Sequence, residues 1–267
     1  MNILEGVIVA LSGEFPETPK PYGWFHLLCF TLTIALIIVA CIWGRKLSDK
    51  GFRRVLILVS ISLMLFELYK QLQFSFNIDD GTWEYGWYYF PFQFCSVPMY
   101  VMFLAGVTKG KVHEYLCAFL ATFAVIGGLI TMFYPTTVFI STIGICIQTM
   151  YWHGMLMVIG VLCWANGRAK FEHKTVLKGA VVFAIVVLLA MVMNIIWNYT
   201  GDIERYSFNM FYISPYMNSG LPVLGDLWSA VPYVVFLPLY IIGFTICAYI
   251  IVLIAKVIHR LTHRRKS

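Results

Sequence analysis

The chain has 267 residues, of which 60% are hydrophobic and 12% are charged, and its formal net charge is +6. Soluble domains carry about 25% charged residues, so this composition excludes a water-soluble globular protein and predicts a protein that crosses the membrane several times. The seven cysteines show no paired spacing, which argues against a disulfide framework. The expected spans use almost the whole length, so we expect a single all-α domain, a bundle of seven transmembrane helices over residues 1–267.

The first apolar run, Ile3–Leu11, is short, contains Glu5 and has no basic residue before it. It lacks the features of a cleaved signal peptide, and we expect an interfacial helix instead. Seven later segments have the roughly 20 mostly apolar residues that a transmembrane helix needs. In chain order, the expected spans are residues 24–43, 55–74, 90–107, 112–133, 143–164, 176–199 and 231–258.

Basic residues gather in alternate loops, which this span assignment places on one side of the membrane. They are Arg45, Lys46, Lys50, Arg53, Arg54, Lys109, Lys111, Arg168, Lys170, Lys174, Lys178, Lys256, Arg260, Arg264, Arg265 and Lys266. The other side carries Lys20, Arg205, Asp79, Asp80, Glu84, Asp202, Glu204 and Asp226. The positive-inside rule then predicts an N-terminus outside and a C-terminus inside. The positive charge also predicts attraction to anionic headgroups at the inner face, not binding to nucleic acid.

Polar side chains inside the expected spans are costly, so each is a candidate functional group. Glu67, Lys70 and Gln71 share one face of the second span, because they are spaced i, i+3 and i+4. A buried ion pair that fixes helix packing is the alternative explanation. For Asn194 and Asn198 in the sixth span, hydrogen bonding between helices is the favoured interpretation.

Cys95 lies between two prolines in the sequence YYFPFQFCSVPMY, residues 88–100. Pro91 is expected to start the third span and Pro98 to kink it beside the thiol, since proline is tolerated in a first turn and breaks backbone bonds further along. A nucleophilic thiol needs a base, which is usually histidine. His153 is placed deep in a span, so Cys95–His153 is the candidate dyad; a buried cysteine at a kink and a hydrogen-bonded core histidine are the alternatives.

At 1.5 Å per helical residue, the embedded polar groups fall in the outer half of the expected bundle. Cys95, Glu67, Lys70 and Asn194 lie a few residues from the outer ends of their spans, and His153 lies about ten residues from its outer end. The inner half is occupied by leucine, isoleucine, valine and phenylalanine. We therefore expect a polar pocket that opens toward the outer leaflet.

Three segments carry a resemblance to a known family. FPFQFCSVPMY resembles the LPLHLC segment of the YwaF-type bacterial proteins, and YWHGMLMVIG resembles that family's helix with a central His-Gly. The stretch from Phe208 to Phe236 resembles a third family segment, at positions Asn209, Phe211, Tyr212, Pro215, Leu224, Gly225, Trp228, Pro232 and Tyr233. The family includes the animal transmembrane protein 164 group. Gln93 stands where the family has a histidine, and a glutamine cannot shuttle a proton near neutral pH.

The resemblance implies a lipid acyltransferase that moves a fatty acyl chain between phospholipids, with Cys95 as nucleophile and His153 as its partner. The expected substrate contacts are Glu67, Lys70, Gln71, Gln93, Asn194, Asn198, Asn209 and Asp226. No metal or nucleotide motif is present in the sequence, so no metal or cofactor is expected, and the expected partners are membrane phospholipids and lysophospholipids. An acyl hydrolase is the same chemistry with water as acceptor. The alternatives are a proton-coupled or small-solute transporter that uses Glu67, Lys70 and His153, and a non-catalytic lipid-binding protein of the cell membrane.

Overall fold

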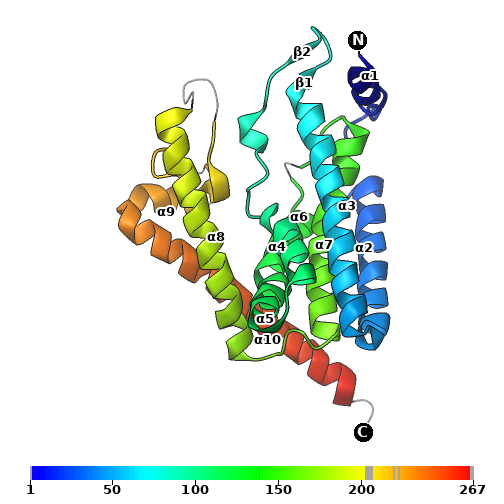
Figure 1. The fold of residues 1–267 in the computed structure, drawn as a ribbon, viewed down its shortest axis with the longest axis vertical. Helices are drawn as coiled ribbons and strands as arrows, with labels where there is room; N and C mark the ends of the chain where they lie inside the picture. Colours follow the sequence, from blue (N-terminus) through cyan, green and yellow to red (C-terminus); the bar gives the residue numbers. More distant parts are fainter. Residues whose placement is uncertain (1, 137, 202–206, 219, 222, 265–267) are drawn as a thin grey trace.

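The computed structural model describes residues 2–136, 138–201, 207–218, 220–221 and 223–264. In these residues the chain is all-α apart from one short hairpin, as expected, and Figure 1 shows an elongated bundle of helices. The elements are α1 (Ile3–Ala10), α2 (Trp24–Trp43), η1 (Gly44–Lys46), α3 (Asp49–Ser75), β1 (Phe76–Asn77), β2 (Thr82–Trp83), η2 (Trp87–Tyr89), α4 (Val97–Val107), α5 (Gly110–Phe119), η3 (Leu120–Ala124), α6 (Val125–Phe133), α7 (Ile143–Ala165), α8 (His173–Thr200), η4 (Met210–Tyr212), α9 (Leu224–Ala230) and α10 (Tyr233–Arg264).

Among the described residues, six helical segments are long and apolar enough to cross a membrane. They are α2 with η1, α3, α5 to α6, α7, α8 and α10, and they correspond to six of the seven expected spans. A membrane protein of several spans is thereby confirmed. In the place of the third span, α4 has 11 residues, which is shorter than the roughly 20 that one helix needs to cross alone.

The expected start of the third helix at Pro91 is wrong. Residues 90–96 are not helical, Ser96 is the N-cap of α4, and Pro98 lies in the first turn of that helix. A first-turn N–H has no partner within its helix, so proline costs little there. Pro98 therefore begins a helix rather than kinking one, and Cys95 lies just before the helix.

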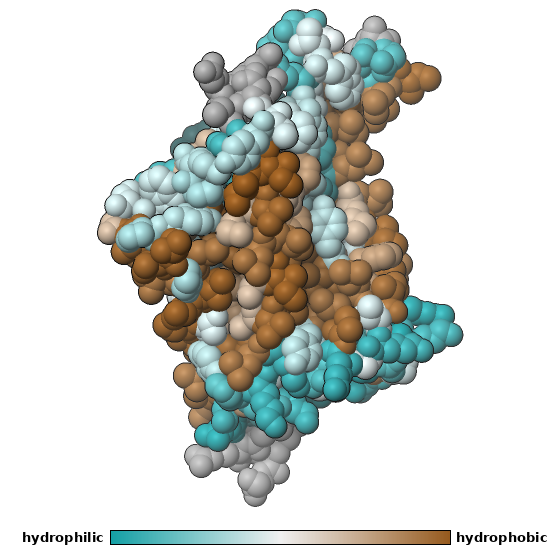
Figure 2. Space-filling view, turned by 60° about the vertical axis from the view of Figure 1, so that its left-hand side comes forward, coloured by the Kyte–Doolittle hydropathy of each residue, from teal (hydrophilic) through white to brown (hydrophobic). Residues whose placement is uncertain are grey.

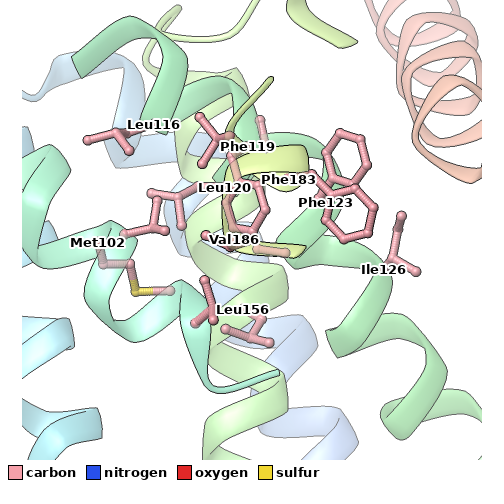
Figure 3. Packing of buried hydrophobic residues seen from close by; sticks show 14 of the residues in the cluster. Met102, Leu116, Phe119, Leu120, Phe123, Ile126, Leu156, Phe183 and Val186 are labelled. Carbon is pink, nitrogen blue, oxygen red and sulfur yellow. The ribbon is translucent and has the colours of Figure 1, made fainter. Parts of the chain in front are cut away.

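The core lies where α4, α5, η3, α6, α7 and α8 meet (Figure 3). Met102, Phe119, Phe123, Leu156 and Phe183 are fully buried there. In the most apolar 18-residue stretch of the continuous segment from α5 to α6, 78% is buried, whereas in the corresponding stretch of α10 only 11% is buried. The α5–α6 segment is therefore central, and α10 lies at the edge of the bundle with most of its surface exposed.

Close packing of α6 on α7 depends on glycine. A Cβ added at Gly128 would lie 2.7 Å from the carbonyl oxygen of His153 and 2.8 Å from Met157. At Gly160, an added Cβ would lie 2.1 Å from a methyl group of Val125. A side chain larger than that of glycine would not fit at either position without a shift, and Gly128 sets the distance between α6 and the backbone of His153.

Large apolar side chains are exposed along the outer helices, for example Leu32, Leu58, Leu189 and Leu253. Figure 2 shows an apolar belt between two hydrophilic ends. Helices of 20 to 28 residues extend over about 30 to 42 Å, which matches the thickness of a bilayer. The belt is therefore the surface that faces lipid.

One hydrophilic end is formed by η1, residues 108–110 and residues 166–172, and we call it the basic end. Its three loops meet, since Asp49, Lys109 and Arg168 line one cavity. The opposite end carries α1 and the β1–β2 hairpin (Figure 1), and we call it the hairpin end. Some residues used to predict the orientation lie outside the described residues, namely Asp202, Glu204, Arg205, Arg265 and Lys266.

Candidate functional site

Cys95 and His153 line the same cavity, which we call the thiol cavity. Its volume is about 380 Å³. It lies between α3, α7, the segment from η2 to α4 and the segment that precedes α7. Its walls are formed by Glu67, Lys70, Phe74, Tyr88, Tyr89, Cys95, Ser96, Val138, Ile140, Ile145, Gln148, Thr149, Trp152 and His153. Four of the residues singled out in the sequence therefore meet there: Cys95, His153, Glu67 and Lys70.

Cys95 is a half-buried free thiol on the short irregular segment before α4. Its backbone carbonyl accepts a 2.7 Å hydrogen bond from the indole Nε1 of Trp152. Trp152 is itself only 2% exposed, so the indole is held firmly by its surroundings. The position of the thiol therefore depends on a side chain of α7, the helix that also carries His153.

His153 lies in the middle of α7, and its Nδ1 is 2.8 Å from the carbonyl oxygen of Thr149. A carbonyl oxygen can only accept a hydrogen bond, so in the neutral ring Nδ1 carries the proton and Nε2 has a free lone pair. In the described part of the chain, Nε2 makes no hydrogen bond, and none joins the ring to the Cys95 thiol. A base and a thiol thus line the same cavity.

A buried charged network borders the thiol cavity. The Glu67 carboxylate is 5% exposed and lies 2.8 Å from the Lys70 ammonium. Gln71 donates to the same carboxylate and to the carbonyl of Tyr89, both at 2.6 Å. The second carboxylate oxygen of Glu67, Oε2, has no hydrogen-bond partner among the described residues. The expected shared face of Glu67, Lys70 and Gln71 is confirmed. Glu67 and Lys70 line the thiol cavity, and Gln71 holds the Glu67 carboxylate without lining the cavity itself.

Several residues that line the thiol cavity were not among the candidates named from the sequence. Gln148 is 5% exposed, and its Oε1 accepts a 3.3 Å bond from the Thr149 hydroxyl. Its Nε2 donates to no partner within the described residues, so the amide is available to a ligand. A polar amide in an apolar span, five residues before His153, is a signal that sequence reasoning could have used.

Other lining residues could not be recognised as candidates from the sequence, because aromatic and small hydroxyl residues are common near membrane interfaces. They are Tyr88, Tyr89, Ser96 and Trp152. Burial raises the pKa of Tyr89, and the neighbouring Tyr88 raises it further. The Tyr89 hydroxyl therefore stays protonated at neutral pH and can donate a hydrogen bond.

Gln93 and Asn194 fix the loop that contains η4 instead of lining the thiol cavity. Gln93 donates to the carbonyl of Asn209 at 3.0 Å and accepts from the N–H of Phe211 at 2.9 Å. Asn194 in the same way donates to the carbonyl of Met210 at 3.0 Å and accepts from its N–H at 2.8 Å. Phe211 has a left-handed backbone conformation, with φ of 58°. These paired bonds replace the regular partners that such a turn lacks.

Asn209 acts within the same loop. Its side chain accepts a 2.8 Å bond from the N–H of Ser214 and donates to the carbonyl of Met217 at 3.2 Å. We refer to Gln93, Asn194 and Asn209 as the loop clamp. The side-chain amide of Gln93 is therefore engaged by the loop through both its oxygen and its nitrogen.

Asn198 and Asp226 also lie away from Cys95. Asn194 and Asn198 line a separate cavity of about 150 Å³ between α8 and the η4 loop. Asp226 is exposed in the first turn of α9. The structure thus does not bring these expected substrate contacts to the thiol cavity, and a direct role for either asparagine beside the thiol has no geometric support.

Comparison with known protein families shows a match to a family model. The model of the TMEM164 family matches residues 21–256, a range that begins just before α2 and ends within α10. Neither a curated protein nor a solved structure matches the chain significantly. The matched range includes every residue of the thiol cavity and the loop clamp. Since the match covers most of the chain, this protein belongs to the TMEM164 family.

Proposed function

We propose that this protein is a membrane-embedded acyltransferase that moves a fatty acyl chain between phospholipids through a thioester on Cys95. With water as acceptor the same chemistry is acyl hydrolysis. The observation that carries the proposal is the shared cavity of Cys95 and His153, in which an imidazole nitrogen without a hydrogen bond faces the same space as a free thiol. A thiol with a nearby base is the arrangement that covalent acyl transfer needs.

In the first step, Nε2 of His153 takes the thiol proton, and the Cys95 sulfur attacks the carbonyl carbon of a phospholipid ester. The C–O bond of the ester breaks, and the departing lysophospholipid oxygen takes the proton from His153. In the second step, the hydroxyl of an acceptor lysophospholipid gives its proton to His153 and attacks the thioester. The C–S bond breaks, and the sulfur recovers the proton. Both steps use one base in its two protonation states.

Developing negative charge on the ester oxygen needs donors inside the cavity. Gln148 Nε2 and the Lys70 ammonium are the polar donors that we assign to this task, since both residues line the walls with Cys95. The Glu67 carboxylate holds Lys70 at 2.8 Å and sets its position. Gln148 is not among the substrate contacts expected from the sequence, and its place in the proposal comes from the cavity wall that it shares with Cys95.

The acyl donor in this proposal is a lipid already in the bilayer. Phe74, Val138, Ile140 and Ile145 give the cavity apolar walls beside its polar groups. Binding sites for small amphipathic molecules typically combine mostly apolar walls with a few placed polar groups. Phospholipids and lysophospholipids are therefore the partners that we propose for the thiol cavity.

For the topology we propose seven crossings in the cell membrane, with the N-terminus outside and the C-terminus inside. The third crossing would combine α4 with the non-helical residues 90–96 before it, which are half-buried or buried against the rest of the protein. Irregular backbone at membrane depth is tolerated where protein or a cavity surrounds it. The basic end would then face anionic headgroups inside, and the thiol cavity would lie toward the outer leaflet.

A proton-coupled transporter is the competing function for Glu67, Lys70 and His153. It would need polar groups from the thiol cavity to the basic end. Along α3, the buried side chains between Glu67 and the basic end are Leu63, Ser60, Leu56 and Phe52. Ser60 donates to the carbonyl of Met99 at 2.8 Å, and the others are apolar. This packing favours chemistry inside one cavity over transport.

The test is acyl transfer by the purified protein. Nanodiscs that contain a phospholipid with a labelled acyl chain and an unlabelled lysophospholipid should yield a labelled product, and a trapped thioester should be released by hydroxylamine. Cys95→Ala should abolish both signals, while Cys29→Ala, a half-buried cysteine outside the thiol cavity, should keep them. Acyl transfer by the Cys95→Ala protein at the wild-type rate would contradict the proposed mechanism. Absence of transfer by the wild type, with lipid still bound, would favour a non-catalytic lipid-binding protein.

A further inference from the structure

A second cavity lies at the basic end and is independent of the thiol cavity. Its volume is about 480 Å³. It is lined by Asp49, Arg53, Thr108, Lys109, Gly110, His113, Glu114, Ala118, Gly167, Arg168, Lys170, Glu172, Thr175 and Lys178. We call it the basic cavity. Along α3, Arg53 is separated from Glu67 of the thiol cavity by fourteen residues, or about 21 Å.

The charges of the basic cavity are only partly compensated. Asp49 is shared by two arginines, with Arg168 Nη1 at 2.9 Å and Arg53 Nε at 3.2 Å. Glu114 pairs with Lys178. Lys109 and Lys170 have no carboxylate within 4 Å in the part of the chain that the structure describes. The basic lining residues are Arg53, Lys109, Arg168, Lys170 and Lys178, and the acidic ones are Asp49, Glu114 and Glu172, so the lining has a net charge of +2.

The arginine nearest the middle of this network is fixed before any ligand binds. Arg168 donates through Nε to the Asn166 side chain at 2.9 Å, and its guanidinium lies 5.2 Å from the ring centre of Phe52. Asn166 in turn donates to the carbonyls of Gly44 and Leu47. The Nε of Arg53 is buried and lies 3.2 Å from the Asp49 carboxylate. Among the described residues, this Nε makes no hydrogen bond of good geometry. A preorganised guanidinium loses little freedom when it binds an anion.

Two helices also begin at this cavity. The N-cap of α5 is Lys109 and that of α8 is Glu172, and neither helix has a side-chain cap within the described residues. The first N–H groups of a helix have no partner within it, and the helix dipole places partial positive charge there. Phosphate groups bind at such ends. The two helix ends therefore supply donors that add to the lysines and arginines.

We propose that the basic cavity binds a phosphoryl group, either as a soluble phosphate or as the phosphomonoester headgroup of an anionic lipid. Arginines, unpaired lysines and two helix ends without side-chain caps line one cavity, and a phosphomonoester carries the charge and the acceptor oxygens that this set requires. The proposal does not depend on acyl transfer. It also goes beyond the general attraction of the basic end for anionic headgroups, because it assigns the binding to one cavity.

Matched lysine pairs separate the cavity from the general surface charge. Lys109 and Lys170 line the cavity, whereas Lys111 and Lys174 are exposed neighbours that do not. The Lys109→Gln/Lys170→Gln and Lys111→Gln/Lys174→Gln proteins lose the same charge, since Lys111 and Lys174 lie in the first turns of α5 and α8, close to the cavity lysines in sequence. Affinity is measured with the full-length protein in phosphatidylcholine nanodiscs containing phosphatidic acid, and separately in detergent with inorganic phosphate. Thermal unfolding of each variant verifies that it is folded.

We expect the cavity pair to weaken binding of phosphatidic acid by about 25-fold, at about fivefold for each lysine, and the control pair to weaken it by much less. Binding of inorganic phosphate in detergent with the same lysine dependence would identify a soluble ligand; binding confined to phosphatidic acid would identify a lipid headgroup. Equal losses in both pairs would overturn the proposal and leave only diffuse attraction. Absence of binding by the wild type in both assays would overturn it as well.

Discussion

At the residue scale, Cys95 and His153 are each oriented by a backbone hydrogen bond and not by each other. The Trp152 indole holds the carbonyl of Cys95, and the carbonyl of Thr149 holds Nδ1 of His153. Trp152, His153 and Thr149 all belong to α7, so one helix positions both side chains of the proposed dyad. In the proposed mechanism, the ester binds in the cavity that the thiol and the imidazole both line.

We expect His153→Gln to lower kcat for acyl transfer by about 10²–10⁴-fold. A glutamine amide cannot take the thiol proton near neutral pH. Transfer of the labelled acyl chain in nanodiscs measures the change. His173→Gln, an exposed histidine of the basic end, serves as the control and should keep the wild-type rate. An undiminished kcat in His153→Gln would remove the histidine from the mechanism.

We expect Gln148→Leu to lower kcat by about 10²–10³-fold, since it removes a donor to the developing oxyanion in a water-poor cavity. KM should change little, because the interaction forms mainly in the transition state. The matched control is Gln73→Leu, whose amide bonds the carbonyl of Ile8 outside the thiol cavity. A rise in KM at constant kcat would instead assign Gln148 to ground-state binding.

At the scale of elements, the α6–α7 contact and the loop clamp position the site from two sides. Gly128 lets α6 approach the backbone of His153. Gln93, two residues before Cys95, ties the segment that carries the thiol to the η4 loop. The non-helical conformation of residues 90–96 is thus stabilised by contacts that are distant in the sequence.

Two adjacent glycines give a test of the α6–α7 contact. At Gly128 an added Cβ would meet the His153 carbonyl oxygen at 2.7 Å, whereas at Gly127 the nearest atoms lie 3.6 Å away. We expect Gly128→Ala to destabilise the protein by about 1–3 kcal/mol and to reduce acyl transfer, because the backbone of His153 must move. Gly127→Ala should leave both nearly unchanged. Thermal unfolding in detergent and the transfer assay measure the two effects, and equal behaviour of the two variants would contradict the tight contact.

The loop clamp has its own matched pair on α8. Asn194→Ala removes two hydrogen bonds to Met210 and leaves its buried N–H without the Asn194 acceptor, while its carbonyl keeps a 3.4 Å bond from the N–H of Ile213; Asn198 makes no hydrogen bond among the described residues. We expect Asn194→Ala to cost about 1–2 kcal/mol and Asn198→Ala to cost much less. Thermal unfolding in detergent reports the difference. Identical midpoints would show that the clamp contributes nothing to stability.

At the scale of the whole molecule, the apolar belt and the two hydrophilic ends set how the bundle lies in a membrane (Figure 2). Membrane-impermeant maleimide labelling tests the proposed topology, in a background with the exposed Cys41 and Cys247 replaced by serine. A cysteine at the exposed Asp79 of the hairpin end should react in intact cells. Cysteines at Lys50 and Lys111 should react only after permeabilisation. Reaction at Lys111 in intact cells would contradict a third crossing.

The sequence alone was sufficient for the membrane class, for the places of six long helices and for the shared face of Glu67 and Lys70. These properties are local: apolar length defines a span, and helical spacing defines a face. The same reasoning gave the wrong start for α4. A proline is equally suited to begin a helix at position 91 or at position 98, and long-range contacts of the segment decide between them.

For the candidate site, the sequence by itself determined that Cys95, His153, Glu67 and Lys70 are embedded polar groups of unusual cost. The tertiary structure alone decided that these four meet in one cavity with Gln148 and Trp152, while Gln93, Asn194 and Asn209 bind the η4 loop. The physical reason is that helical periodicity fixes the direction of a side chain relative to its own helix. Packing between helices, such as that of Gly128 on α7, sets how the helices are rotated against one another. This rotation decides which side chains of different helices come into contact.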